Sequence, residues 1–491
     1  MSGRVSALGA QARTTTTTLR ARLSKDSRAA LSRRAGRIRL FPAVTLALLA
    51  GLGVAFIAYG FLRWITPVDT AKAAAEIDVT RVALTVVAGV GGVVALVIAY
   101  RRQRDLEQSR FVERFGAAAT QLGATDVAVR IAGVYAMAGV ADESDGLRRQ
   151  QCIDVLCGYL RLPYSPELGA NHQSKLVLKQ HRATADGTRA DDQERHLEYR
   201  HNDREVRATI VRVIADHLRT TAEYSWSTSD FDLRTAHLEN VDFTGARFLG
   251  SARFNSATFS GTTRFSYATF SDDPSFNDVT FSEGTWFNDA TFSATASFNN
   301  ATFSATTSFN NVTFPDVTRF SHATFSDEAW FSKVAFSATA WFNGTTFSDN
   351  AVFSDVTFSA TTVFDGATFS GDAMFNSTTF SATARFRGAT FSATAMFDGT
   401  TFSGYARFDD VTFSAARFNS ATFSATAMFN STTFSGDARF EKVDFGSGTV
   451  SFVNPRQWGP PAPIFDWDPD LSQKPANVEP QDWPPALVPA T

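Results

Sequence analysis

Cysteine and histidine are scarce in this sequence. Of 491 residues, only Cys152 and Cys157 are cysteines, five positions apart in a helical pattern, and seven are histidines. Two cysteines exclude a disulfide framework, and their spacing does not match a zinc site. A loose cluster of histidines lacks both helix-face spacing and a carboxylate partner: His172, His181, His196 and His201. We therefore expect both cysteines to be core residues, and no metal or other cofactor.

Motifs that support catalysis are missing as well. The chain has no phosphate-binding loop and no nucleophile elbow, and its many Ser and Thr residues lack a positioned base. Asp272, Asp273, Asp409 and Asp410 fall where corners or loops are expected, so they are interpreted as solvated surface. We predict that the protein is not an enzyme. Reproducible turnover of any substrate by the purified protein would contradict this.

The small net charge of −3 conceals a strong segregation of charge. Residues 1–39 carry ten Lys or Arg against the single acid Asp26, whereas residues 230–452 carry 22 acids and 12 bases. The basic tail could contact anionic lipid or nucleic acid, but it is explained more simply as a signal for membrane orientation.

Two uncharged apolar runs are long enough to cross a bilayer. Residues 40–62 and 82–100 comprise 23 and 19 residues, the first about 34 Å long as a helix. Basic residues precede the first run and follow the second, whereas the loop at 63–81 is poorer in them. By the positive-inside rule, both termini then face the cytoplasm. We predict a two-span plasma-membrane protein with the lipid bilayer as one partner.

Helical and linker segments are expected between the second run and residue 225. Apolar residues at helical spacing predict three helices in a compact cytoplasmic unit at 101–164, the first of which ends near Gly123. Residues 165–202 are polar without an apolar period and are predicted to be a linker. A further helix at 203–218, within the segment 203–225, leads into the repeat region that begins near residue 226 and could cover one end of it.

Phenylalanine is the dominant large residue after position 230. Nearly all of the 46 Phe residues follow position 230, and from Phe243 they recur at alternating steps of five and six. One residue is missing between Phe413 and Phe418, after which the rhythm resumes to Phe445. A small side chain stands two positions before each Phe, with Pro274 the exception. Such repetition predicts a solenoid whose units bury their apolar faces by stacking. The core should include Ala290, Phe292, Ala296, Phe298, Ala301, Phe303 and Phe309.

The coil should contain 22 residues. Eleven would leave a cross-section of only a few ångströms for two rings, whereas 22 make four faces with one inward Phe each. With coils about 4.8 Å apart, residues 243–445 give roughly nine coils and a rod of about 45 Å.

At this point the sequence resembles the pentapeptide repeat proteins, whose units place a small residue two positions before a central Leu or Phe. Ala301 with Phe303, Ala367 with Phe369, and Ala421 with Phe423 match that pattern, and residues 226–248 are similar too. The resemblance implies a mainly β fold, a right-handed quadrilateral β-helix, over residues 226–452. This chain departs from the family pattern by preferring Phe to Leu and by adding one residue to every second unit. Residues 111–160 resemble the juxtamembrane segment of membrane-anchored actinobacterial members.

Any residues that recognise a partner should be those that face outward from the solenoid, because core packing determines the inward-facing residues. The residue before Phe is Thr in all but one of the 17 units of one register, and Ser follows the Phe in all but one. These residues form two constant Thr and Ser ladders on opposite faces. The other register varies and supplies the candidate interaction surface: Arg253, Arg264, Trp286, Trp330, Trp341, Arg385 and Arg407. The three tryptophans could instead simply cover neighbouring coils.

Three functions fit such a rod. The preferred one is a non-enzymatic, membrane-anchored scaffold that binds an unidentified cytoplasmic protein; a homodimer is left open. The second follows the family resemblance, since some members mimic DNA and protect gyrase, but −10 over residues 230–452 is mild for a duplex mimic, and we expect no nucleic-acid partner. The third is ice or surface binding by the Thr and Ser ladders. Residues 453–491, rich in Pro and Trp, could fold over the last coil or bind a partner.

Overall fold

The computed structural model describes residues 74–164 and 203–487, two strands between them, and isolated positions among residues 53–65 and at 166. The chain divides into two compact units, residues 1–112 and 113–491. The basic tail and most of the first predicted span lie outside the described residues. The second predicted span lies within helix α3 (Ala74–Leu122). No helix among the described residues combines the length and apolar character needed to cross a membrane. The two spans remain a prediction.

Two details of the N-terminal half differ from expectation. The second apolar run and the first helix of the predicted unit form one continuous helix, α3, because no Pro or Gly separates them between residues 93 and 115. The predicted linker contains an antiparallel hairpin of β1 (Lys175–Gln180) and β2 (Gln193–Glu198). Its register places Lys179 opposite Glu194 and Leu176 opposite Leu197.

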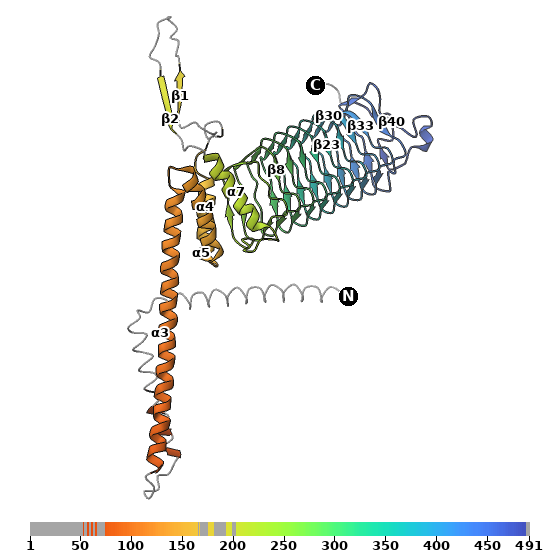
Figure 1. The fold of residues 1–491 in the computed structure, drawn as a ribbon. Helices are drawn as coiled ribbons and strands as arrows, with labels where there is room; N and C mark the ends of the chain where they lie inside the picture. The colour runs from red at the N-terminus through yellow and green to blue at the C-terminus, as the bar shows by residue number, and fades with distance from the viewer. Residues whose placement is uncertain are drawn as a thin grey trace. The chain divides into compact units, whose positions relative to one another are not determined.

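Three short helices form a cap at one end of the solenoid (Figure 1). They are α4 (Val127–Asp142), α5 (Leu147–Leu160) and α7 (Asp203–Leu218). Asp126 begins α4, because its Oδ1 accepts hydrogen bonds from the backbone N–H of Ala128 and Val129 at 2.8 and 3.1 Å. The helices pack against one another, α5 contacts β3, and α7 contacts β4. The expectation that residues 203–218 cover an end of the rod is confirmed.

The repeat forms a β-solenoid with four faces, each built of parallel strands (Figure 1). Thr280 pairs with Thr258 on one side and Thr302 on the other, so these coils contain 22 residues as predicted, whereas Thr401 pairs with Thr422 in a coil of 21 where one residue is missing. Every backbone ladder therefore joins one coil to the next, which satisfies the polar groups of very short strands. The first face carries eleven strand positions, about two turns more than predicted, because coils form before residue 243 and after residue 445.

Face 1 and face 2 meet at one corner and share two longer strands. Face 1 contains β4 (His237–Glu239), β7 (Thr258–Ser260), β10 (Thr280–Phe281), β14 (Thr302–Phe303), β18 (Thr324–Phe325), β22 (Thr346–Phe347), β26 (Thr368–Phe369), the starts of β30 (Thr390–Met396) and β33 (Thr412–Arg417), β36 (Thr433–Phe434) and β39 (Gln457–Trp458). Face 2 contains β8 (Thr263–Arg264), β11 (Thr285–Trp286), β15 (Thr307–Ser308), β19 (Ala329–Trp330), β23 (Ala351–Val352), β27 (Ala373–Met374), the ends of β30 and β33, β37 (Ala438–Phe440) and β40 (Ile464–Phe465). The register shifts within β30 and β33, which places the missing residue at this corner.

Face 3 and face 4 complete the coil. Face 3 contains β5 (Arg247–Phe248), β9 (Thr269–Phe270), β12 (Thr291–Phe292), β16 (Thr313–Phe314), β20 (Ala335–Phe336), β24 (Thr357–Phe358), β28 (Thr379–Phe380), β31 (Thr401–Phe402) and β34 (Thr422–Phe423). Face 4 contains β3 (Phe231–Asp232), β6 (Ala252–Arg253), β13 (Ala296–Ser297), β17 (Thr318–Arg319), β21 (Ala340–Trp341), β25 (Thr362–Val363), β29 (Ala384–Arg385), β32 (Ala406–Arg407), β35 (Ala427–Met428), β38 (Val450–Ser451) and β41 (Val478–Glu479).

The interior consists of four columns of stacked phenylalanine rings. Phe298, for example, stacks on Phe276 at 4.9 Å and on Phe320 at 4.7 Å between ring centroids, with interplanar angles of 3° and 4°. Rings of the opposite columns of faces 2 and 4 meet edge to face across the interior, a geometry that aromatic pairs prefer. The predicted core is confirmed, because none of its members is more than 2% exposed: Ala290, Phe292, Ala296, Phe298, Ala301, Phe303 and Phe309.

The five-residue corners require a left-handed backbone. The residue two positions after the Phe of face 2 or face 4 has a positive φ, for example 58° at Lys333 and 65° at Gly366. A side chain there strains the backbone, and Asn and Asp tolerate the strain better than most residues. Asn and Asp are accordingly frequent at these positions, among them Asp278, Asp289, Asn300, Asn311, Asp355 and Asp410.

The strain at these corners predicts a stabilising substitution. Lys333→Gly should raise the free energy of unfolding by about 0.5–1 kcal/mol, because glycine adopts this φ freely. The reverse change, Gly366→Lys, should lower it by a similar amount; a Cβ at Gly366 would meet no heavy atom within 4 Å, so backbone strain alone is tested. Chemical denaturation of both variants measures the effect. Shifts of the same sign would contradict this explanation.

Aromatic residues of the Pro-rich segment close the far end of the solenoid. β39, β40 and β41 continue the ladders of β36, β37 and β38. The Trp483 ring packs edge to face on Phe452 and Phe465 at 5.9 and 5.0 Å between centroids. Trp467 is buried against Phe445. The expectation that this segment folds over the last coil is confirmed, and neither end of the Phe columns is left open.

Candidate interaction surface

The predicted recognition residues lie on the two variable faces of the solenoid, which are opposite each other. Arg264, Trp286 and Trp330 belong to face 2. The other predicted residues belong to face 4: Arg253, Trp341, Arg385 and Arg407. The ladders of faces 1 and 3 separate the two sets. A single partner surface therefore cannot contain all seven residues.

The outward residues of face 2 form an unbroken column. Direct strand pairing sets the order Arg264, Trp286, Ser308, Trp330, Val352, Met374, Met396, Arg417 and Arg439. Four successive members, Trp330 to Met396, are apolar, and Trp286 lies two coils before them. Val352 and Met396 are absent from the predicted set, because neither stands out in the sequence as a Trp or an Arg does.

Both tryptophans of face 2 are half-buried and held by neighbours in their own or the adjacent coil. The Trp286 indole lies over Gly284, where a Cβ would come within 2.4 Å of its Cη2. The Arg264 guanidinium stands 5.6 Å from the centre of the Trp286 ring. The Trp330 Nε1–H donates to the Glu328 carboxylate at 3.2 Å. Both indoles are therefore oriented before any partner arrives, while part of each ring stays in contact with solvent.

On face 4 the arginines are occupied by ion pairs within the solenoid. Arg385 pairs with Asp365, and the Arg407 Nε is 3.0 Å from the Asp409 carboxylate. The hydrogen bond to Asp409 raises the pKa of Arg407. Arg253 donates from Nε to the Ser251 hydroxyl at 3.1 Å. Trp341 is 37% exposed. Face 4 is thus largely neutralised by its own side chains.

Asparagine ladders hold successive coils together at the five-residue corners, a function that the sequence analysis missed. The Oδ1 of Asn277 accepts from the Asn299 N–H at 3.0 Å, and the Oδ1 of Asn299 accepts from the Ser321 N–H at 3.2 Å. Asn310 and Ser332 repeat the contact at 2.8 Å. Asn, Asp and Ser recur directly after Phe in this register, which was the available signal. These side chains are structural because their acceptors are used.

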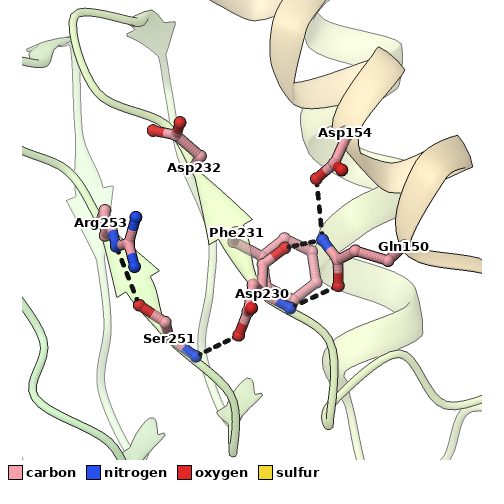
Figure 2. Close-up of a pocket in the computed structure, with 7 residues that line it drawn as sticks. All are labelled: Gln150, Asp154, Asp230, Phe231, Asp232, Ser251 and Arg253. Carbon is pink, nitrogen blue, oxygen red and sulfur yellow. Dashed lines mark hydrogen bonds between the residues drawn. The ribbon is translucent and has the colours of Figure 1, made fainter. Parts of the chain in front are cut away.

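A small polar cavity of about 220 Å³ lies between α5 and the first coils (Figure 2). Figure 2 shows the Gln150 side chain exchanging hydrogen bonds with the Asp230 backbone, at 2.7 and 2.8 Å, and donating to Asp154. The Asp230 carboxylate in turn accepts from the Ser251 N–H at 2.9 Å. These contacts join the cap to the solenoid. No nucleophile with an adjacent base is present among the residues that line this cavity.

The two cysteines lie in the core of the helical cap. Both are buried, and burial raises the pKa of the Cys152 thiol to about 11 and that of Cys157 to about 12. Neither is a thiolate near neutral pH, so neither is a nucleophile or a metal ligand. Among the described residues, no group of three or more His, Cys, Asp or Glu side chains is arranged to hold a metal. His172, His181 and His201 lie outside those residues.

Comparison with known proteins identifies the repeat. A family model described as pentapeptide repeats (9 copies) matches eight overlapping segments that together span residues 233–444: 233–280, 243–291, 265–313, 287–334, 309–357, 320–368, 353–401 and 397–444. Searches of curated proteins and of solved structures found no match.

Proposed function

Because residues 233–444 are pentapeptide repeats folded into a β-solenoid, we propose that this protein is a non-enzymatic interaction module anchored in a membrane. One observation carries the proposal. Hydrogen bonds between successive coils satisfy the backbone and stacked Phe rings fill the interior, so side-chain identity varies mainly at the outward positions of faces 2 and 4. A rod with constant interior and variable outward columns suits recognition of another protein, since exposed Trp, Met and Arg side chains are typical of interface centres.

Membrane anchoring rests on the sequence. The uncharged runs at 40–62 and 82–100, with basic residues before the first and after the second, support two spans with both termini in the cytoplasm. The plasma membrane is the proposed location. Reporter fusions at the C-terminus test this arrangement, and a reporter active only outside the cytoplasm would reverse the topology.

Partner capture from native membranes tests the interaction. We expect crosslinking of the full-length chain, followed by purification, to recover at least one protein whose yield falls about tenfold in either the Trp286→Ala/Trp330→Ala variant or the Trp341→Ala variant. Thr291→Ala, an exposed change on the constant face 3, is the control and should retain the partner. Recovery of the same proteins at unchanged yield by all three variants would contradict the proposal.

A further inference from the structure

Face 2 carries an apolar stripe of defined length. From Trp286 to Met396 the column advances five coils, which at about 4.8 Å each is roughly 24 Å. Ser308, the one polar member, is buried at 5% exposure, so it does not interrupt the stripe with an exposed polar group. A helix of about 16 residues has the same length.

Carboxylates border the stripe on both sides. One corner carries Glu283, Asp327, Glu328, Asp349 and Asp372, and the other carries Asp289 and Asp355. The solenoid's ion pairs, all within the described residues, use other acids: Asp232, Glu239 and Asp242 in the first coils, and Asp365, Asp398, Asp409, Asp410 and Asp437 further along. At the two corners that border face 2 from Trp286 to Met396, the only basic residue is Lys333. The borders of face 2 therefore present negative charge that the protein itself does not neutralise.

The other three faces lack this combination. Face 4 pairs Arg385 and Arg407 with its own aspartates, as described above. Faces 1 and 3 present the Thr and Ser ladders. Within the described solenoid, only on face 2 does an apolar column run between borders that carry several carboxylates without ion pairs and a single basic residue, Lys333.

From this arrangement we infer that face 2 binds a basic amphipathic helix of a partner protein. The inference rests on the proposed interaction function and names the class of partner. Because the backbone groups of face 2 are already paired along the ladder, an extended segment cannot add as a further strand, and recognition uses side chains. A helix laid along the column places its apolar stripe on the half-buried Trp330, Met374 and Met396, because Val352 between them is only 6% exposed. Lys or Arg on its two flanks then reaches the two borders.

A designed peptide tests the inference on the full-length chain in nanodiscs of zwitterionic lipid, with empty nanodiscs as the blank. The probe is a labelled Leu/Lys peptide of about 18 residues with Leu at helical spacing, and its comparator has Glu in place of each Lys. Fluorescence anisotropy should show the basic peptide binding at least about tenfold more tightly than the acidic one, and less tightly as salt is raised.

Charge-reversal variants on two different corners localise the binding. Glu283→Lys/Asp349→Lys should weaken it by about tenfold or more. The control Asp272→Lys/Asp316→Lys makes the same change in net charge at the corner between faces 3 and 4. It is also matched in geometry, because the Asp316 carboxylate accepts from the Val317 N–H at 2.6 Å as Asp349 accepts from Asn350 at 2.7 Å. It should stay within about twofold of the parent chain, by the additivity of distant sites.

Apolar variants complete the test. Trp330→Ala/Met374→Ala should weaken binding about tenfold or more, whereas Trp341→Ala on face 4 should have little effect. Circular dichroism confirms that each variant is folded. Equal losses in the face 2 and control variants, or unchanged binding in all of them, would overturn the inference. If a native partner is recovered but is indifferent to the face 2 variants, this inference fails and the proposed function stands. If the peptide binds as expected but no native partner is found, the proposed function fails instead.

Discussion

Replacing Phe309 by alanine is expected to lower the free energy of unfolding by about 3–5 kcal/mol. The ring is fully buried and stacks between Phe287 and Phe331, at centroid distances of 4.8 and 5.1 Å. It also meets Phe298 and Phe320 edge to face at 5.5 and 5.4 Å. The 22-residue register fixes all four neighbours, so none can move into the space without breaking its own stack. Most of the cavity should therefore persist, which keeps the cost near the upper part of the range.

Two further variants separate packing from volume. Phe309→Leu keeps most of the apolar volume and should cost about 1–1.5 kcal/mol. Ser304→Ala, at an exposed position of the preceding corner, should stay within about 0.5 kcal/mol. Denaturant unfolding followed by circular dichroism measures all three, and hydrogen exchange reports whether the loss is confined to neighbouring coils. An alanine variant that loses less than the leucine variant would contradict the columnar core.

The solenoid could be predicted from the sequence because its period is set by packing between identical units. Phe298 and Phe320 stack only when one coil holds 22 residues, so the spacing of Phe determines the register directly. The left-handed corners were not predictable in the same way. Lys333, at φ of 58°, has no intrinsic preference for that conformation. The repeating coil imposes it on whichever residue occupies the position.

The cap and the hairpin show where such reasoning weakens. Apolar spacing located α4, α5 and α7 closely, but β1 and β2 are short and polar, and only their pairing reveals them. The candidate surface was predictable in composition but not in arrangement. The sequence marks Arg385 and Trp330 as outward residues, yet whether a charge is paired depends on a residue one coil away. Asp365, 20 positions before Arg385, accepts its guanidinium. Because of that contact, Arg385 is no longer a free charge for a partner. Among the described residues, the carboxylates that border Trp330 make no such ion pair, so face 2 remains the candidate binding surface.

Loss of Arg130 is expected to destabilise the packing of the three cap helices against one another. The Arg130 side chain is fully buried in α4, where its Nη1 lies 2.7 Å from the Asp203 carboxylate of α7 and 3.0 Å from the Tyr159 hydroxyl of α5. The Tyr159 hydroxyl also donates to Asp203 at 2.6 Å. One guanidinium thus joins all three helices of the cap. Removing one member of a buried ion pair leaves an uncompensated charge, so Arg130→Met should cost about 3–5 kcal/mol.

Matched variants show whether the charge or the packing is responsible. Arg219→Met removes an arginine directly after α7 whose pair with Asp216 is solvent-exposed, and it should cost at most about 1 kcal/mol. Arg130→Met combined with Asp203→Leu should recover part of the stability lost by Arg130→Met alone, because the Asp203 carboxylate is then absent, while the buried Arg207, 3.9 Å from Asp203, keeps its hydrogen bonds to the carbonyls of Tyr159 and Leu160. Proteolysis rates at α4 and α7 and the denaturant midpoint provide the measurements. If the double variant is as unstable as the single one, the guanidinium acts mainly through its packing and its bond to Tyr159. The cap would then depend on the shape of Arg130 rather than on its charge.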